Sequence, residues 1–239
     1  MAGYATRLYP LTLNTPKALL QIAGKPIVEY ILDEIYTIPD IDKVYVVTNS
    51  KFYPNFCDWV EGLSGNKPIE VIDDGTSTEE TRLGAVGDIK FTIDRCAIDD
   101  DLMIIAGDNF FTYRLADYYA DFRKNPHDFV VAKELDDIEQ LKHFAVAKLD
   151  ADGRIIDLQE KPSKPESNIA IYATYTYLRE TLPLFERYFA EGNRGDAPGY
   201  FVQWLHKIKP VYAWRMNGDC YDIGTQKAYD DVRAMFEGI

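Results

Sequence analysis

Apolar residues in the first half of the chain form short runs that alternate with segments of helical spacing. Runs rich in Val and Ile, which are typical of buried strands, occupy Lys43–Thr48, Ile69–Ile72, Leu102–Ala106 and Phe129–Lys133. Between them, apolar residues recur at helical spacing over Pro26–Tyr36, Tyr53–Leu63, Leu83–Ile93 and Leu115–Lys124. This alternation predicts an α/β fold in which helices cover both faces of a mostly parallel sheet.

The pattern changes in the second half of the chain. Shorter, often alternating segments that are typical of strands lie at Phe144–Leu149, Ile155–Gln159, Ile169–Tyr177 and Val211–Trp214. They predict a mixed or antiparallel extension of the same sheet. Residues 226–236 have the spacing of an amphipathic closing helix. Because no linker or repeat interrupts the chain, we expect one domain over residues 1–239.

Composition narrows the class of protein. With 46% hydrophobic and 13% aromatic residues, the chain is an ordinary globular one. No apolar run approaches the roughly 18 residues that a membrane span requires, and the first residues lack the features of a signal peptide. The three cysteines are scattered, which indicates neither a disulfide framework nor a zinc site. We therefore expect a cytoplasmic protein without a membrane partner.

The net charge of −13 bears on the choice of ligand. It argues against nonspecific binding of nucleic acid, because such binding needs a basic face that releases counterions from the phosphates. A small phosphorylated ligand needs only a local group of cations and a metal ion, since salt screens more distant charge within about 8–10 Å. Small phosphorylated molecules therefore remain as partners.

A loop of small and cationic residues precedes the first predicted helix. Residues 3–17 combine Gly3, Ala5 and Thr6 with Arg7 and Lys17. Small residues leave backbone N–H groups free to approach phosphate oxygens, and an arginine fork and a lysine charge complete such a cradle. On chemistry alone, a polar loop with two solvated cations fits the same residues equally well.

Two aspartates follow short apolar segments that lie far apart in the sequence. Asp108 comes just after the predicted strand Leu102–Ala106, where open α/β sheets bind ligands. Mg²⁺ prefers one or two carboxylates together with substrate phosphates and water, and Asp222 offers the second carboxylate. Taken singly, each aspartate also fits a helix cap or a turn.

Four motifs together resemble the signature of the sugar-phosphate nucleotidyltransferases. The string GYATRLYPLTLNTPKALLQIAGKPIVEYIL is similar to the pattern G-x-G-T-R-L-x-P-x-T-x-x-x-P-K-x-L-x-x-I-x-G-K-P, with Ala5 in place of the second glycine. The later motifs follow in the family's order: GDN at 107–109, EKP at 160–162, and YDIGT at 221–225, where W-x-D-I-G-T is usual. The resemblance covers nearly the whole chain and implies a Rossmann-like, mostly parallel mixed sheet flanked by helices.

The resemblance implies an enzyme that couples a sugar-1-phosphate to a nucleoside triphosphate. Attack occurs in line on the α-phosphate, and pyrophosphate is released. The residues that it assigns to the nucleotide are Gly3, Tyr4, Ala5, Thr6, Gly84 and Asp108. Arg7 and Lys17 would contact the nucleotide phosphates. Asp108 and Asp222 would jointly hold Mg²⁺, which neutralises charge on the α-phosphoryl group.

For the acceptor, the resemblance implies that Lys161 contacts the phosphate and Glu160 faces the sugar hydroxyls. The acceptor pocket is expected to include residues 168–177 and 199–204. Tyr175 fits either a sheet core or a surface that stacks on a sugar or encloses a quaternary ammonium group. Residues 75–88 are expected to read the base, with a pyrimidine as our prediction.

Three other functions remain open. Small cytidylyltransferases that act on phosphocholine share this length and these motifs. A regulatory relative that binds nucleotide or sugar phosphate without turnover is the second, although the intact Arg7, Lys17, Asp108, Lys161 and Asp222 argue against a decayed site. The third is a structural subunit of a larger complex, supported only by the acidic surface that the net charge implies. A homo-oligomer is compatible with each of these functions.

The family's loop normally follows a buried strand of roughly K-A-I-I-L-A. The sequence begins at Met1-Ala2-Gly3, so we expect this first strand to be missing from the chain. A parallel sheet that lacks a central strand exposes backbone ladder groups and apolar surface. We therefore expect poor activity or unusual association.

Overall fold

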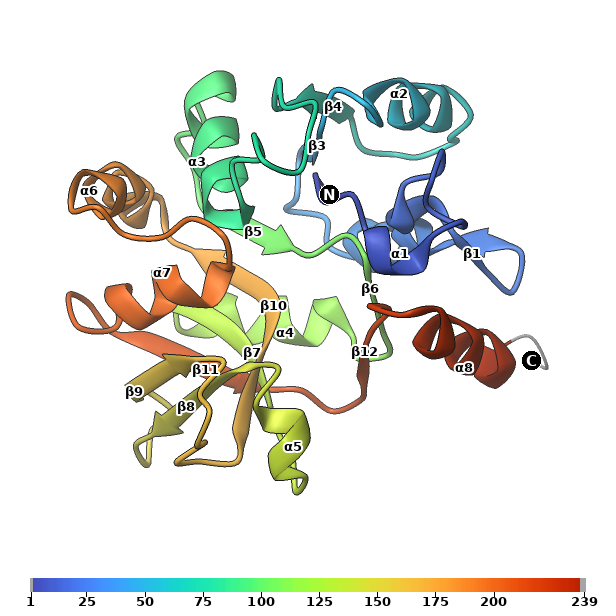
Figure 1. Ribbon diagram of the computed structural model, residues 1–239. Helices are drawn as coiled ribbons and strands as arrows, with labels where there is room; N and C mark the ends of the chain where they lie inside the picture. Colours follow the sequence, from blue (N-terminus) through green and yellow to red (C-terminus); the bar gives the residue numbers. More distant parts are fainter. Residues whose placement is uncertain (1, 237–239) are drawn as a thin grey trace. The chain divides into compact units, whose positions relative to one another are not determined.

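The computed structural model describes residues 2–236, which divide into two compact units (Figure 1). The first unit contains residues 2–82, 106–119 and 218–236, and the second contains residues 83–105 and 120–217. Helices and strands are mixed in both units, which confirms the expected α/β class. No helix within the described range is long and apolar enough to cross a bilayer.

The first unit consists of short sheets and helices. In chain order its elements are η1 (Thr6–Leu8), η2 (Lys17–Leu19), β1 (Gln21–Ile22), β2 (Lys25–Pro26), α1 (Ile27–Tyr36), β3 (Val44–Thr48), α2 (Tyr53–Glu61), β4 (Ile69–Asp73), β6 (Asn109–Phe111), β12 (Cys220–Asp222) and α8 (Gln226–Phe236). β3 and β4 pair in parallel, whereas β1 pairs with β2 and β6 pairs with β12 in antiparallel fashion.

Helix α1 shows why these residues fold as they do. Ile27, Ile31 and Ile35 recur at helical spacing, and all three are buried. Pro26 stands just before the helix, where a missing N–H costs no helical hydrogen bond. One end of this face joins a core whose fully buried members include Leu8, Ile22, Ile27 and Ile223. This core fixes η1 beside the segment that follows β12.

The segment before η1 forms no strand among residues 2–5. Instead, the Asn49 side chain donates a 2.9 Å hydrogen bond to the Ala2 carbonyl. Tyr4 is buried, and its ring centroid lies 6.2 Å from that of Phe52. These contacts anchor the start of the loop to the segment that follows β3. They do not test whether a further strand precedes the loop.

The second unit is built on one larger sheet. Its elements are α3 (Ala85–Cys96), β5 (Leu102–Ile105), β7 (Asp128–Glu134), α5 (Ile138–Leu141), β8 (Ala145–Leu149), β9 (Ile155–Glu160), β10 (Ile169–Tyr177), η3 (Arg179–Thr181), α6 (Leu184–Ala190), α7 (Pro198–Leu205) and β11 (Val211–Arg215). The strand order is β11-β7-β10-β8-β9, and β5 also pairs with β10. Only β7 and β11 run parallel, whereas β10 is antiparallel to β5, β7 and β8.

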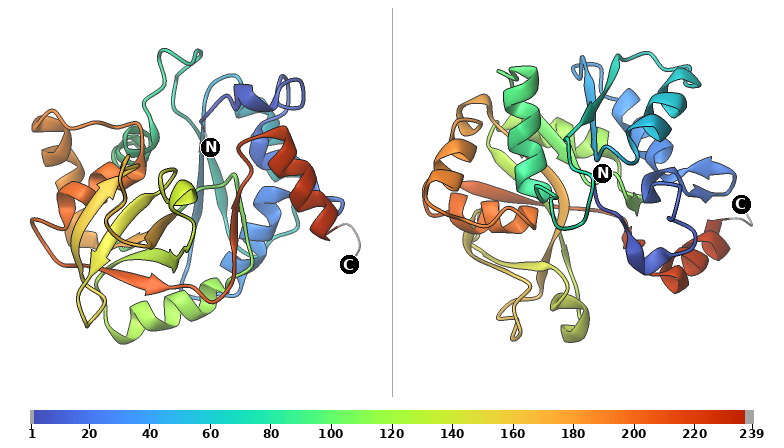
Figure 2. Two further views of the ribbon diagram at one scale, coloured as in Figure 1. Left: turned by 60° about the horizontal axis from the view of Figure 1, so that its bottom comes forward. Right: turned by 45° about the horizontal axis from the view of Figure 1, so that its top comes forward.

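Helices cover both faces of this sheet (Figure 2). Val130 and Ala132 of β7 share a core with residues of α3, α6 and α7. The alternate residue Phe129 meets Phe122, which belongs to α4 (Leu115–Lys124), at 6.4 Å between ring centroids. Successive strand residues point to opposite faces, so the apolar run of β7 reflects burial on both sides.

Candidate active site

Lys17 joins the two aspartates singled out from the sequence. Its ammonium donates hydrogen bonds of 3.0 Å to Asp108 Oδ2 and 3.2 Å to Asp222 Oδ1. The Lys17 side chain is 9% exposed, whereas those of Asp108 and Asp222 are 44% and 62% exposed. The carboxylates therefore lie at the surface, above a buried cation.

Strand pairing brings the two aspartates together. In the antiparallel ladder of β6 and β12, Asp222 stands opposite Asn109, which follows Asp108 directly in the sequence. The peptide N–H of Thr112 donates to the Asp219 carbonyl at 2.9 Å and extends the pairing. The register of this short ladder thus sets the spacing of the two carboxylates.

The charge of Lys17 keeps Asp108 ionised. Partial desolvation by the surrounding protein raises the pKa of the Asp108 carboxyl, but the charge and the hydrogen bond of Lys17 outweigh this effect, so the pKa lies below its usual value. A carboxylate that remains ionised at neutral pH suits a role as ligand for a cation.

Arg7 lies beside the same cluster. A methyl group placed on Gly224 would lie 3.3 Å from Asp222 Oδ2 and 3.5 Å from Arg7 Nη2, so both side chains border this glycine. Arg7 is exposed, and its guanidinium has no hydrogen bond within residues 2–236. It is therefore available to an anionic ligand.

The backbone of the loop before η1 is tightly held. Ala5 has a φ of 47°, in the left-handed region, which explains why glycine suits this position in the family pattern. Its carbonyl accepts hydrogen bonds from the Thr12 hydroxyl at 2.8 Å and from the Leu8 N–H at 2.9 Å. Gly3 and Thr6 are exposed, whereas Tyr4 is buried and serves the core.

The two aspartates fit a divalent cation that also binds phosphate. Both already share one ammonium, so both can face one ion. No group of three His, Cys, Asp or Glu residues among the described residues could enclose a metal. The donors present match the preference of Mg²⁺ for one or two carboxylates completed by phosphates and water.

Glu160 and Lys161 lie in the second unit, at the end of β9. Lys161 has a φ of 46°, and its N–H donates to the Phe144 carbonyl at 3.1 Å. Its side chain is exposed and has no hydrogen bond or ion pair within the described chain. Burial raises the pKa of the Glu160 carboxyl, although the charge of Lys161 opposes this shift.

The structure explains why position 84 is a glycine, which the sequence alone did not show. Its φ is 79°, and a Cβ atom there would lie 2.5 Å from the Gly195 carbonyl oxygen. That oxygen accepts a 2.9 Å hydrogen bond from the N–H of Val86, in the first turn of α3. Only glycine allows this approach of two backbones. The predicted contact with a base remains untested.

Tyr175 requires a correction. We expected it among the substrate-binding residues, but it is 3% exposed and belongs to the hydrophobic core of the second unit. Its ring stacks on that of Tyr177, which is 1% exposed, at 6.1 Å. Because β10 is paired on both edges and covered on both faces, alternate aromatic positions on it are interior.

Sequence reasoning missed Asn49 altogether. It is fully buried, its carboxamide oxygen accepts from the Phe52 N–H at 3.0 Å, and its amide holds Ala2. A polar pair, Thr48-Asn49, directly after an apolar strand was the available signal. Asn49 therefore anchors the loop before η1 to the segment that follows β3.

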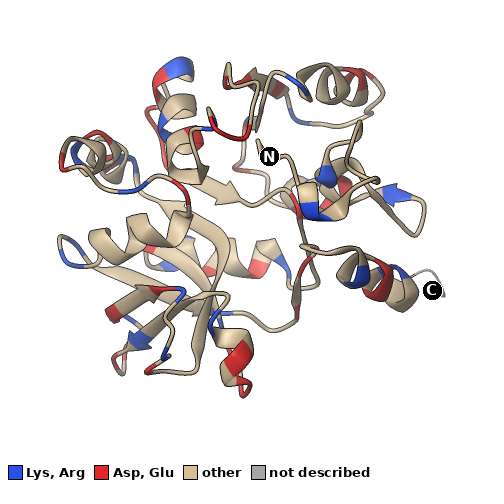
Figure 3. Cartoon of the chain, viewed as in Figure 1, with Lys and Arg blue, Asp and Glu red and all other residues tan. Residues whose placement is uncertain are grey.

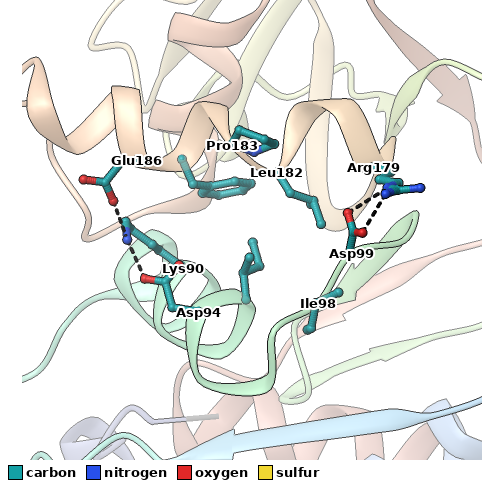
Figure 4. A pocket seen from close by; sticks show the side chains of 10 residues that line it. Lys90, Asp94, Ile98, Asp99, Arg179, Leu182, Pro183 and Glu186 are labelled. Atoms are coloured by element: carbon teal, nitrogen blue, oxygen red, sulfur yellow. Dashed lines mark hydrogen bonds and ion pairs between the residues drawn. The ribbon is translucent and has the colours of Figure 1, made fainter.

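A hollow of about 170 Å³ in the second unit contains none of the predicted site residues (Figure 4). Its floor is apolar, and its two cations are already paired: Lys90 with Asp94 and Glu186, and Arg179 with Asp99. Acidic and basic residues are interspersed in each unit (Figure 3). Neither observation marks a second anion site.

Comparisons with known proteins agree with this geometry. A family model described as nucleotidyl transferase matches residues 1–237. The bifunctional protein GlmU of Methanocaldococcus jannaschii is 27% identical over 93% of the chain and 50% of its own length. A Sulfolobus acidocaldarius protein, named for guanyl transfer to mannose-1-phosphate, is 32% identical over 75% of the chain and 47% of its own length.

The chain thus spans about half the length of these curated relatives. Among solved structures, a UDP-glucose pyrophosphorylase complexed with UDP-glucose superimposes with a TM-score of 0.82. The sequence identity is 19%, and the match covers 99% of the chain and 96% of that structure. At this identity the likeness concerns the fold alone.

Proposed function

The chain belongs to the nucleotidyl transferase family, and from this premise we propose that it joins a sugar-1-phosphate to a nucleoside triphosphate and releases pyrophosphate. The observation that carries the proposal is the cluster of Lys17, Asp108 and Asp222, with Arg7 beside it. Two anions and two cations at one surface suit a triphosphate that arrives with a divalent ion.

In this proposal the first unit binds the nucleotide. Arg7 contacts the phosphates through its exposed fork, and Gly3 to Thr6 offer backbone N–H groups. Lys17 exchanges one of its carboxylate partners for a phosphate oxygen. Asp108 and Asp222 hold Mg²⁺, which when bound neutralises charge on the phosphoryl group under attack.

The second unit binds the acceptor. Lys161, whose ammonium has no partner within residues 2–236, contacts the phosphate of the sugar phosphate, and Glu160 accepts hydrogen bonds from its hydroxyls. The reaction needs no general base, because a phosphate monoester with a second pKa of about 6 is already ionised at neutral pH. The chief task of the protein is to bring two anions together in line, through position and charge.

We further propose a pyrimidine nucleotide. The support is a Haloferax volcanii relative, named for uridylyl transfer to glucose-1-phosphate and 28% identical over 74% of the chain, whereas the relative named for guanyl transfer points to a purine. We also propose that residues 1–239 form one nucleotidyltransferase domain. We propose neither nucleic acid nor a membrane as a partner.

A substrate panel tests the proposal. Purified protein with Mg²⁺ is mixed with each of ATP, CTP, GTP, UTP and dTTP, and with glucose-1-phosphate, mannose-1-phosphate, N-acetylglucosamine-1-phosphate or phosphocholine. We expect pyrophosphate release with a pyrimidine nucleotide and a sugar phosphate, and its loss on addition of EDTA. Release with a purine alone would overturn the choice of base, and no release with any sugar phosphate would overturn the function.

Phosphocholine transfer gains no support. An aromatic enclosure for its quaternary ammonium group would need exposed rings, but the candidate ring, Tyr175, is buried, and so is its stacking neighbour Tyr177.

A further inference from the structure

The Glu160 carboxylate lies against a helix position that has no side chain. A Cβ atom on Gly199 would lie only 1.7 Å from Glu160 Oε2 and 2.9 Å from Glu160 Cδ. No real Cβ tolerates such distances, so any other residue at this position displaces the carboxylate. Gly199 has an ordinary backbone conformation, so its lack of a side chain is explained by close neighbours rather than by a turn: chiefly Glu160, and less tightly Ala145, whose Cβ would lie 3.0 Å away.

The backbone of Glu160 is held by the same helix. The Glu160 N–H donates a 3.0 Å hydrogen bond to the side-chain oxygen of Gln203. Gln203 lies one helical turn after Gly199, so the two residues share one face of α7. One helix face thus fixes both the peptide and the carboxylate of Glu160.

The carboxylate itself has no donor. No group within residues 2–236 donates a hydrogen bond to either of its oxygens, although burial already raises the pKa of this carboxyl. A half-buried carboxylate that lacks donors is costly. Such a group favours a ligand that brings hydroxyl donors.

We propose that Gly199 and Gln203 are positioning residues, which aim the Glu160 carboxylate at the hydroxyls of a sugar phosphate and so select hydroxyl-bearing acceptors. The inference rests on the proposed function and adds two residues to it. Gly199 provides the space and Gln203 fixes the strand end, while neither needs to touch the substrate.

Gly199→Ala provides the main test. The added methyl group pushes the Glu160 carboxylate aside, and a displacement of about 1 Å can cost up to about 100-fold in rate. We expect the KM for the sugar phosphate to rise at least about tenfold, with little change in the KM for the nucleotide. Gly62→Ala, at a site where the new methyl finds ordinary 3.5 Å contacts, is the matched control.

A double variant separates positioning from general damage. Glu160→Asp shortens the side chain and leaves room for the methyl group, so Gly199→Ala combined with Glu160→Asp should lose less kcat/KM than the product of the two single losses. Gln203→Met, which keeps the shape and removes the acceptor oxygen, should also raise the KM for the sugar phosphate, and Gln203→Glu should restore part of the loss. If Gly199→Ala fails to fold, the Gln203 pair still decides.

The outcomes distinguish this inference from the proposed function. If Gly199→Ala and Gln203→Met both turn over a sugar phosphate with an unchanged KM, the positioning role is wrong and the proposed function stands. Strictly multiplicative losses in the double variant would also overturn it. Absence of turnover with every sugar phosphate would overturn the proposed function and this inference with it.

Discussion

Single residues decide the chemistry of this protein through the charges next to them. Asp108 stays ionised because Lys17 outweighs the effect of desolvation, whereas the Glu160 carboxylate receives no hydrogen bond from residues 2–236 and its pKa is raised by burial. Arg7 and Lys161 are exposed cations without internal partners in the described chain. The residues whose charges are shared or unpaired in the described chain are thus residues of the sequence motifs.

Asp108→Asn should abolish turnover and preserve the fold. The amide has nearly the same volume but no charge, so Lys17 loses one anionic partner and the site loses a proposed metal ligand. The rate of pyrophosphate release and the thermal unfolding midpoint measure the two effects. Asp231→Asn, on the exposed face of α8, is the control. A rate above about a tenth of wild type would show that Asp108 is dispensable, because a lost charge contact is worth at least about tenfold.

Lys161→Ala should affect the two substrates unequally. Its ammonium is exposed and unpaired within the described residues, so its removal should leave the fold intact and weaken binding of one phosphate. We expect the KM for the sugar phosphate to rise more than the KM for the nucleotide in steady-state assays. Equal increases in both would remove Lys161 from the acceptor site.

At the scale of elements, strand ends are fixed by buried polar groups. Asp128 is fully buried at the start of β7. It accepts hydrogen bonds from the Leu178 N–H at 2.8 Å and the Thr181 hydroxyl at 2.9 Å, and it pairs with Lys209 at 3.1 Å. These contacts join β7, the end of β10, η3 and the segment before β11.

Asp128→Ala should therefore destabilise the protein strongly. Removal of the carboxylate leaves the Leu178 N–H and the Thr181 hydroxyl without this acceptor, which typically costs about 1–3 kcal/mol for each buried group, while Lys209 keeps a carboxylate partner in Glu180 at 2.8 Å. Chemical denaturation gives the change in the free energy of unfolding. Asp231→Ala removes an exposed i,i+4 pair with Lys227, and it should cost about 0.5 kcal/mol or less. Similar losses in the two variants would contradict the assigned role.

Local patterns predicted the strands well and their partners poorly. The Val- and Ile-rich runs of β3, β4 and β7 are properties of a few neighbouring residues, so the sequence showed them. The antiparallel pairing of β5 with β10 depends on contacts between residues about 70 positions apart. β6 and β12 have only three residues each, too few for a period, and yet their register places Asp108 beside Asp222.

At the scale of the whole molecule, the two units explain why motifs that are distant in sequence were hard to place. The first unit gathers three separate stretches of chain, so Lys17 meets Asp108 and Asp222 across 91 and 205 positions. The family resemblance named these residues, whereas periodicity could not. Tyr175 was misplaced because the sequence does not show that β10 is covered on both faces.

The stability of the whole chain should depend on pH through His206. This histidine is buried at the end of α7, and its Nε2 has no hydrogen-bond partner in the described chain. Burial lowers its pKa from 6.5 in the folded state. Above the unfolded pKa of about 6.5, the histidine is neutral in both the folded and the unfolded chain, and the stability has its full value. As the pH falls below about 6.5, the unfolded chain takes up the proton more readily than the folded chain, so the free energy of unfolding decreases.

We therefore expect the free energy of unfolding to fall between about pH 7 and pH 5 in the wild-type protein. His206→Gln should reduce this slope, whatever its effect on absolute stability. His143→Gln, at an exposed position, should leave the slope unchanged. Denaturation curves at several pH values measure the difference, and an unaltered slope in His206→Gln would assign the pH dependence to other groups.

Because Asp108 and Asp222 share the ammonium of Lys17, substitutions at these three residues should have unequal consequences. If either acid is replaced, the lysine keeps a neutralising neighbour, and the fold loses little. If Lys17 is replaced by a neutral residue, the two carboxylates lose the ammonium that both contact, and Arg7, which borders Asp222, is the cation left beside them in the described chain. Each acid can therefore replace the other as a partner of Lys17 in stabilising the fold, although not in catalysis, whereas the carboxylate pair as a whole depends on the lysine.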